Sequence, residues 1–213
     1  MRLYAKNVVG IFSSIVTLLA GKKDTLTQLD SEIGDGDLGR TMVSGFKAAL
    51  ESLETMSDGT DLSAMIMEAG LSMADRVPST MGTLLSLGMI RAAREIKGIG
   101  SIDETVFLNM LKAAIAGIEE RSKAKRGDKT LLDALVPAAD AYSDSLAQGG
   151  GFPQCVEAAS GAAWAGVEAT RQMKAVYGKA AAFGISSIGK QDAGATAVAF
   201  VLDGIRLWFG TDK

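Results

Sequence analysis

The chain has 213 residues, of which 47% are hydrophobic, and a formal net charge of −3. A sizeable core can therefore be buried, and no basic surface for nucleic acid or an anionic membrane is expected. The chain has no histidine and one cysteine, Cys155. This excludes a Ser-His-Asp triad, a histidine general base, an intramolecular disulfide and the usual zinc ligands. Any metal would be held by oxygen, most readily magnesium or calcium, and we expect a reducing, cytoplasmic compartment.

The first predicted helix covers residues 4–20. Apolar residues such as Ile11 and Ile15 recur there at helical spacing, with polar residues on another face. A basic start followed by an apolar run is also typical of a signal peptide, but Lys22 and Lys23 stand where a small-x-small cleavage site would follow. We therefore interpret the segment as an amphipathic helix of the mature fold. No segment of the chain is judged long and apolar enough to span a bilayer.

Helical periodicity dominates the rest of the chain, and strand patterns are scarce. Further helices are predicted at 23–31, 39–56, 60–76, 80–97, 102–124, 129–147, 153–175 and 194–209. Helix-start signals support them: Asp103 precedes one run, Asp128 and Thr130 open another, and Pro153 begins a third. We expect an all-α fold in which residues 1–213 form one barrel or bundle of about eight antiparallel amphipathic helices.

An acidic, glycine-rich segment covers residues 30–41. It holds Asp30, Glu32, Asp35 and Asp37, with glycines at 34, 36 and 39. Carboxylates this close repel one another unless a cation lies among them, and magnesium is commonly bound by one or two carboxylates together with phosphate oxygens. The helix that follows offers backbone N–H groups to a phosphate near its start. The segment predicts a metal-and-phosphate site.

Other interpretations of this segment were weighed. Gly34-x-Gly36-x-x-Gly39 matches a dinucleotide fingerprint formally, but helical spacing precedes it where that motif needs a strand. An EF-hand loop would need a glutamate where Phe46 stands, and no Walker sequence is present. A solvated helix cap with Asx turns remains the simple alternative.

Two later loops can complete a pocket. Residues 78–83 and 188–196 each bring hydroxyl and N–H groups to the start of a predicted helix. Each loop taken alone is more often a simple helix cap. Residues 123–129 contain a run of lysine and arginine, which can be a solvated face or can lie over phosphates.

Taken in order, these segments resemble the nucleotide-binding L subunit (DhaL type) of dihydroxyacetone kinase. The matching pieces are Leu29 to Gly39, Met42, Gly45-Phe46, Ile90 to Ala93, Gly127 to Thr130 and Ser187 to Thr196. The resemblance covers nearly the whole chain and implies a barrel of eight helices with a nucleotide at one end. It implies that Asp30, Asp35 and Asp37 hold two magnesium ions. It places the nucleotide against Leu38, Gly39, Arg40, Thr41, Ser79, Thr80, Gly82, Ser122, Leu131, Lys179, Asp192, Ala193 and Gly194.

The resemblance implies a kinase subunit of glycerol metabolism that binds ADP or ATP with magnesium and has no catalytic residue beyond the metal ligands. The triose or ketose acceptor would be held by a separate, sugar-binding K-type subunit, since family members hold it through a histidine that this chain lacks. The donor would be free ATP or a phosphotransferase-system subunit that rephosphorylates bound ADP. We expect neither nucleic acid nor membrane as partners, and a homodimer stays open. The alternatives are an ADP-sensing regulatory module of the same fold and a lipid-holding helical barrel.

The chain also departs from the family pattern. Leu38 stands where a histidine is common, and Lys179 replaces an arginine, which removes a bidentate donor. The second loop reads Pro78 to Gly82 in place of a glycine-rich sequence, which stiffens the backbone. Ala193 replaces a proline of the last loop. The expected metal ligands are kept, whereas the cradle for phosphate and base is altered.

Overall fold

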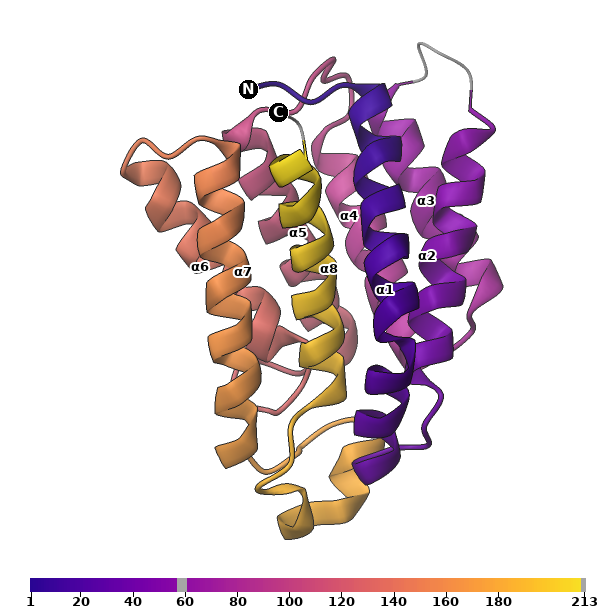
Figure 1. The fold of residues 1–213 in the computed structure, drawn as a ribbon, viewed down its shortest axis with the longest axis vertical. Coiled ribbons are helices and arrows are strands. Elements are labelled where there is room, and N and C mark those ends of the chain that lie inside the picture. Colours follow the sequence, from indigo (N-terminus) through magenta and orange to yellow (C-terminus); the bar gives the residue numbers. More distant parts are fainter. Residues whose placement is uncertain (57–60, 212–213) are drawn as a thin grey trace.

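A computed structural model describes residues 1–56 and 61–211, without the side chain of Thr211. Regular structure in these residues consists of eight α-helices, two 3-10 segments and a single antiparallel bridge between Leu3 and Ile102. The helices are α1 (Ala5–Ile33), α2 (Leu38–Glu54), α3 (Leu62–Arg76), α4 (Thr80–Glu95), α5 (Glu104–Ser122), α6 (Leu132–Ala147), α7 (Phe152–Ala169) and α8 (Ala193–Thr211), with η1 (Thr170–Gln172) and η2 (Lys179–Ser187) before α8 (Figure 1). The predicted all-α class is confirmed.

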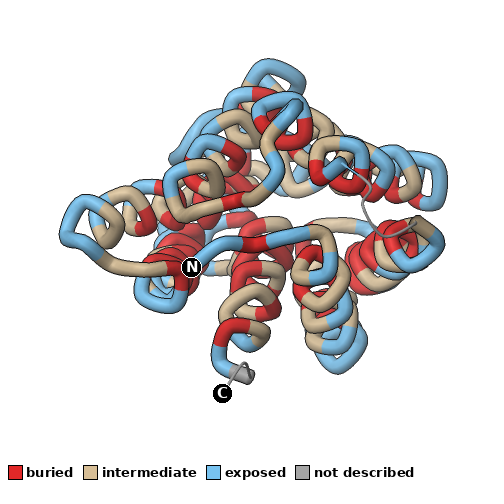
Figure 2. Tube along the Cα trace, turned by 90° about the horizontal axis from the view of Figure 1, so that it is seen from above, coloured by how far each residue is buried: buried red, intermediate tan, exposed pale blue. Residues whose placement is uncertain are grey.

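The helices form a closed antiparallel ring. Each helix packs against the next one in the chain, and α8 returns to pack against α1 (Figure 1). Seen along the helices, buried residues face the inside of the ring and exposed residues face outward (Figure 2). The expected barrel of about eight amphipathic helices is therefore confirmed.

The heptad-like spacing of apolar residues explains how each helix is held in the ring. On α2, Met42, Phe46, Ala49 and Leu53 recur every three or four residues, and all four are buried. Phe46 meets Phe12 of α1 with ring centroids 6.1 Å apart. Full burial of a large apolar side chain contributes about 1.5–3 kcal/mol, so a few such residues hold each helix in place.

Two predicted helix boundaries were wrong. The two helices expected at 4–20 and 23–31 are one helix of 29 residues, α1. Gly21 faces solvent, so it does not interrupt the buried stripe that Leu19 and Leu26 continue on either side. The helix expected at 153–175 ends at Ala169, and the 3-10 segment η2 follows after a turn, where no helix was predicted.

One helix, α8, is long and apolar enough to span a bilayer, judged by length and composition alone. The expectation that no segment of the chain is so was therefore wrong. The window Ala193–Gly210 in α8 reaches a mean hydropathy of 1.2 over 18 residues. Inside the fold, 61% of that window is buried. The apolar character of α8 is accounted for by its packing against α1 and α7, which buries most of this window.

The alternating direction of the helices brings four connections to one end of the barrel. They are residues 34–37, 77–79, 123–131 and 170–192, and they join α1 to α2, α3 to α4, α5 to α6 and α7 to α8. This end lies at the bottom of Figure 1, away from the start of α1 and the end of α8. All four sequence segments with predicted site residues therefore meet at one place.

Candidate functional site

Three carboxylates meet in the turn between α1 and α2. Asp30 lies in the last turn of α1, and Asp35 and Asp37 follow in the turn; one ligand oxygen from each lies within 4.8 Å of the others. Gly36 makes the turn in a left-handed conformation, with φ of 73°, which glycine adopts at little cost. Asp30 also accepts a hydrogen bond from the backbone N–H of Leu38, at 3.2 Å. An oxygen-only set this compact fits a hard divalent cation such as magnesium.

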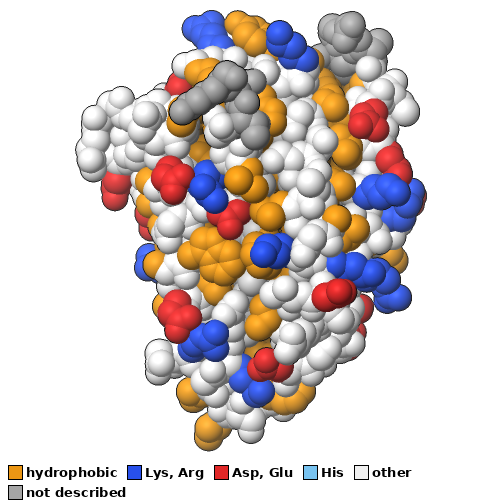
Figure 3. Space-filling model, in the orientation of Figure 1, with side chains coloured by type: hydrophobic (Ala, Val, Ile, Leu, Met, Phe, Trp, Pro, Cys, Tyr) orange, Lys and Arg blue, Asp and Glu red, His pale blue; other side chains and the backbone are white. Residues whose placement is uncertain are grey.

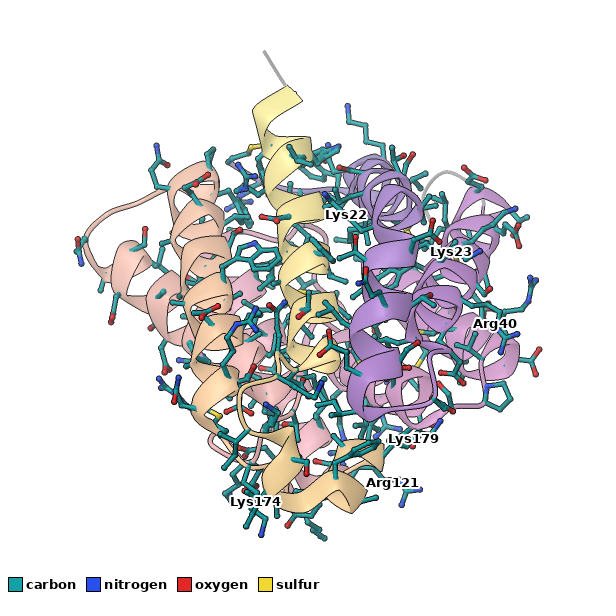
Figure 4. The ribbon with its side chains drawn as sticks, turned by 60° about the horizontal axis from the view of Figure 1, so that its bottom comes forward. Lys22, Lys23, Arg40, Arg121, Lys174 and Lys179 are labelled. Carbon is teal, nitrogen blue, oxygen red and sulfur yellow. The ribbon has the colours of Figure 1, made fainter. Side chains whose placement is uncertain are left out.

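Positive side chains from the segment before α8 lie against this acidic turn. The Lys179 ammonium forms an ion pair with Asp35, and Lys190 lies 3.1 Å from Glu32. In Figure 4, Lys179 and Arg121 lie close to the end of α1, at the same end of the barrel. The opposite charges offset part of the repulsion among the acidic residues.

An open cleft of about 590 Å³ lies at this end of the barrel, beside the acidic turn. Its lining includes all three aspartates and nine of the thirteen predicted nucleotide contacts. Those nine are Leu38, Ser79, Thr80, Ser122, Leu131, Lys179, Asp192, Ala193 and Gly194. The structure thus brings together residues that lie in or next to all four connections at this end of the barrel.

The other four predicted contacts lie outside the cleft lining. A Cβ on Gly39 would stand 2.1 Å from the carbonyl oxygen of Lys23, so Gly39 allows α2 to approach α1 closely. Gly82 is buried in the first turn of α4, and Thr41 is buried in α2. Arg40 is exposed and lies on the outer flank of the molecule, away from Lys179 (Figure 4). Nucleotide contact at these four positions remains a prediction.

The 78–83 loop caps a helix and also lines the cleft, so its two interpretations are compatible. The Ser79 hydroxyl accepts a hydrogen bond from the N–H of Gly82, at 3.0 Å, and so caps α4. Ser79 and Thr80 also line the cleft. The loop therefore begins a helix with its N-terminus at the cleft, where backbone N–H groups favour an anion.

The basic run at 123–129 divides into two kinds of residue. Lys125 and Arg126 are exposed and lie within 4 Å of Glu119 and Asp140, as a solvated face would have them. Lys129 is only 1% exposed and lines the cleft. Its ammonium donates to the carbonyl of Thr170, at 2.6 Å, and to that of Lys190. The sequence predicted Lys129 only as part of a basic run that is either a solvated face or lies over phosphates; its burial was not predicted, because its partners lie far away along the chain.

Burial shifts the pKa of Lys129. Desolvation lowers the pKa of its ammonium, while the carboxylates of Asp192 and Asp133 oppose that shift. The two backbone carbonyls supply acceptors that water would otherwise provide.

Two buried aspartates hold the backbone of the connections at the cleft in place. Asp192 accepts a hydrogen bond from the N–H of Ala195, at 2.6 Å, and caps α8. Burial raises the pKa of Asp192 to about 6, against the lowering effects of the Ala195 N–H and Lys129. Asp133 accepts from the N–H groups of Gly127, at 2.5 Å, and Thr130, at 2.7 Å, and so fixes the loop before α6. Asp133 was missed because a single acidic residue in a helix start gives no sequence signal of burial.

Comparison with known proteins gives a consistent result. Residues 32–207 match the DAK2 domain. The chain is 32% identical over 207 residues to the ADP-binding subunit DhaL of the PEP-dependent dihydroxyacetone kinase of Escherichia coli, covering 97% of this chain and 98% of that protein. It is 29% identical to the D-erythrulose kinase of Mycolicibacterium smegmatis, over 92% of this chain and 34% of that protein.

The fold has a solved counterpart. The crystal structure of the dihydroxyacetone kinase from C. freundii in complex with AMP-PNP and Mg²⁺ superimposes with a TM-score of 0.75 at 24% sequence identity. The match covers 97% of this chain and 34% of that one, so the chain spans about a third of the length of this kinase. From the matched domain and the full-length relative, the chain belongs to the DAK2 domain family and is a homologue of its DhaL subunits over nearly its whole length.

Proposed function

We propose that residues 1–213 act as one nucleotide-binding domain, the ADP/ATP–magnesium subunit of a dihydroxyacetone-type kinase. It would deliver a phosphoryl group to a triose or ketose held on a separate subunit in the cytoplasm. The observation that carries the proposal is the meeting of Asp30, Asp35 and Asp37 at the cleft. The homology to full-length DhaL subunits supports the same assignment.

The lining residues divide the proposed work among them. Asp30, Asp35 and Asp37 would hold magnesium, which on binding neutralises phosphate charge. The helix starts at Thr80 and Ala193 would present backbone N–H groups to the phosphates. Ser122, at the end of α5, and Leu131, just before α6, would border the base and ribose.

Phosphoryl transfer of this kind depends on positioning and charge neutralisation, so the chain needs no covalently modified residue of its own. Family members hold the sugar through a histidine, and this chain has none. A second subunit must therefore supply the acceptor. It must also cover the open cleft, because water would otherwise compete for the phosphoryl group.

An exposed apolar surface at the mouth of the cleft supports docking of that subunit. We define the apolar rim as Val176 (53% exposed), Tyr177 (37%), Phe183 (41%), Ile185 (77%) and Ile188 (46%). Hydrophobic side chains reach the surface at the lower end of the molecule in Figure 3. The rim is continuous with the cleft, since Tyr177 belongs to both. A subunit that covers the cleft would also bury the apolar rim. Removing these apolar side chains from water would favour docking.

We propose bound ADP as the phosphoryl carrier, rephosphorylated by a phosphotransferase-system donor subunit. Three relatives that match this chain over most of their own length are named PEP-dependent. The relatives in which the chain covers about a third of the protein carry other kinase names. This pattern favours the PEP-dependent donor over free ATP.

Thermal unfolding with and without Mg–ADP tests the nucleotide site. We expect the midpoint to rise much more with magnesium and ADP together than with either one alone, since a ligand that binds the folded state stabilises it by mass action. Asp35→Asn should abolish the rise. Asp24→Asn, which removes an exposed carboxylate from the same helix α1 outside the cluster, should leave it intact. If Mg–ADP does not change the unfolding midpoint of the wild-type protein, the proposed function is overturned.

Turnover with the sugar-binding subunit of the source organism tests the kinase role. Dihydroxyacetone phosphate should form when dihydroxyacetone, ADP and the phosphorylated donor subunit are all present, and the chain alone should form none. Ile185→Asp in the apolar rim should lower turnover while keeping the Mg–ADP stabilisation, whereas Leu71→Asp, at an exposed position on α3, should change neither. If the chain binds Mg–ADP but the complete mixture shows no turnover, the kinase assignment is wrong and the ADP-sensing regulatory module takes its place.

A further inference from the structure

A polar junction lies beneath the cleft and joins three segments that are distant in sequence. It consists of Lys129 before α6, Thr170 and Arg171 after α7, and residues 189–192 before α8. Lys129 is central, because its ammonium donates both to the carbonyl of Thr170, at 2.6 Å, and to that of Lys190.

Further hydrogen bonds hold residues 189–192 against the end of α7. The N–H of Gly189 donates to the carbonyl of Arg171 at 2.7 Å, and the N–H of Asp192 donates to the hydroxyl of Thr170 at 3.0 Å. Arg171 also donates to the side-chain oxygen of Gln191, at 2.7 Å. The path of the chain into α8 is therefore set by the junction.

The junction determines where part of the cleft lies. Asp192 belongs to the junction, Ala193 and Gly194 follow it directly, and all three line the cleft. Lys129 is itself held from both sides, since Asp133 accepts from the N–H groups of Gly127 and Thr130. The backbone of Lys129 is left-handed, with φ of 60°, a conformation that is uncommon for a side chain of this size. A small displacement of the ammonium would therefore be passed on to the start of α8.

A buried ammonium is costly unless its donors are satisfied, and an apolar residue would fill the same space without that cost. Lys129 is 1% exposed and still lies near the carboxylates of Asp192 and Asp133. Packing alone does not account for a charge at this position. Its distinctive contribution is two hydrogen bonds to two different segments.

We propose that Lys129 is a positioning residue of the nucleotide site: its ammonium ties the end of α7 to the entry of α8 and so sets the 192–194 wall of the cleft before nucleotide binds. The proposal rests on the proposed function for the identity of the ligand. It differs from that function in that the wall is preassembled by an internal cation that need not touch the nucleotide.

A variant pair tests the effect on binding. Lys129→Met keeps most of the side-chain volume and removes the ammonium; Lys125→Met removes an exposed lysine of the same run. With Kd measured by calorimetry well below both unfolding midpoints, we expect Lys129→Met to weaken Mg–ADP binding by about tenfold to a hundredfold, the range found when an outer partner of a metal site is lost. Lys125→Met should bind as the wild type does. A lower midpoint with unchanged Kd for Lys129→Met would show a purely structural role and overturn the proposal.

Hydrogen exchange on the wild-type protein tests preassembly without any variant. The amides of Gly189 and Asp192 should be protected before nucleotide is added, as the hydrogen bonds of the junction require. Rapid exchange there that becomes slow only with Mg–ADP would overturn the proposal. This measurement decides the matter if Lys129→Met does not fold. If the wild type does not bind Mg–ADP, the proposed function is overturned instead. The exchange rates of the nucleotide-free protein would still show whether the junction is formed.

Discussion

Lys179 and Asp35 are 144 residues apart in the sequence, yet their side chains form an ion pair at the mouth of the cleft. The pair connects the 3-10 segment before α8 to the turn between α1 and α2. Asp35 is one of the three predicted metal ligands, so a lysine and a divalent cation would share one carboxylate. The same lysine also lines the cleft where phosphates are proposed to bind.

Replacing Lys179 should therefore have opposite effects on two ligands. In Lys179→Gln, Mg²⁺ alone should bind up to about fivefold more tightly, because an exposed ion pair contributes only about 0–1 kcal/mol and its loss frees Asp35. Mg–ADP should bind more weakly, because the phosphates lose a nearby cation. Lys174→Gln removes an exposed lysine from the same end of the barrel and should change neither (Figure 4). Calorimetric titration measures both affinities, and a parallel change in the two would contradict the shared carboxylate.

Stability should depend on pH through Asp192. Burial raises its pKa to about 6 in the folded protein, whereas the unfolded chain titrates near the ordinary value of 3.8. Between these values the folded state binds more protons, so this group's contribution to stability falls as pH rises from about 4 to 6 and is smallest above 6. The effect amounts to roughly 3 kcal/mol, since each pKa unit corresponds to about 1.4 kcal/mol.

Urea unfolding at pH 4.5 and pH 7 isolates this contribution. The change in unfolding free energy between the two pH values should differ between wild type and Asp192→Asn, because asparagine can still cap α8 but does not titrate. Asp24→Asn, at an exposed position, should follow the wild type. Identical pH dependence in wild type and Asp192→Asn would contradict the raised pKa.

Two glycines of the first helix pair should respond oppositely to alanine. A Cβ at Gly39 would stand 2.1 Å from the carbonyl oxygen of Lys23, so Gly39→Ala must push α2 away from α1 and should cost about 1–3 kcal/mol. Gly21 has nothing within 4 Å of its Cβ position and lies within α1, so Gly21→Ala should stabilise the protein by about 0.5–1 kcal/mol. Urea denaturation of both variants gives the two signs, and a stable Gly39→Ala would mean that α2 packs less closely than described.

The loop before α6 should depend strongly on Asp133. Asparagine at this position would turn an amide donor toward one of the two N–H groups that Asp133 now accepts from. We expect Asp133→Asn to lower the unfolding free energy by about 1–3 kcal/mol, the usual cost of a buried donor left without an acceptor. Asp128→Asn changes a carboxylate of the same loop that accepts from Lys125 in an exposed setting, and water can replace that bond. Equal losses in the two variants would contradict the buried role of Asp133.

Local sequence patterns were sufficient for the fold class and for the acidic turn. Helical spacing is repeated along the chain, and Asp30, Asp35 and Asp37 lie within eight residues of one another, so no distant contact is needed to bring them together. The remaining loops reach the cleft because the helices alternate in direction, which follows once an antiparallel barrel is expected.

Features that depend on distant partners were not predictable in this way. The acceptors of Lys129 lie 41 and 61 residues away, so the sequence shows only one more lysine in a basic run. Contact between Gly39 and a phosphate stays a prediction, but the close approach of α2 to α1 that Gly39 allows was not predictable, because it depends on the position of Lys23. The segment η2 is a 3-10 segment of nine residues that Gly184 interrupts with a non-helical conformation, and no element was predicted there.

The cleft and the chain termini lie at opposite ends of the barrel. The start of α1 and the end of α8 lie together at the end opposite the cleft (Figure 1). A fluorescent reporter or an affinity handle joined at either terminus would therefore leave the mouth of the cleft and the apolar rim open to a docking subunit. Protein attached to a surface through either terminus would turn the end that carries the cleft toward solution. Binding of a partner there could then be measured directly.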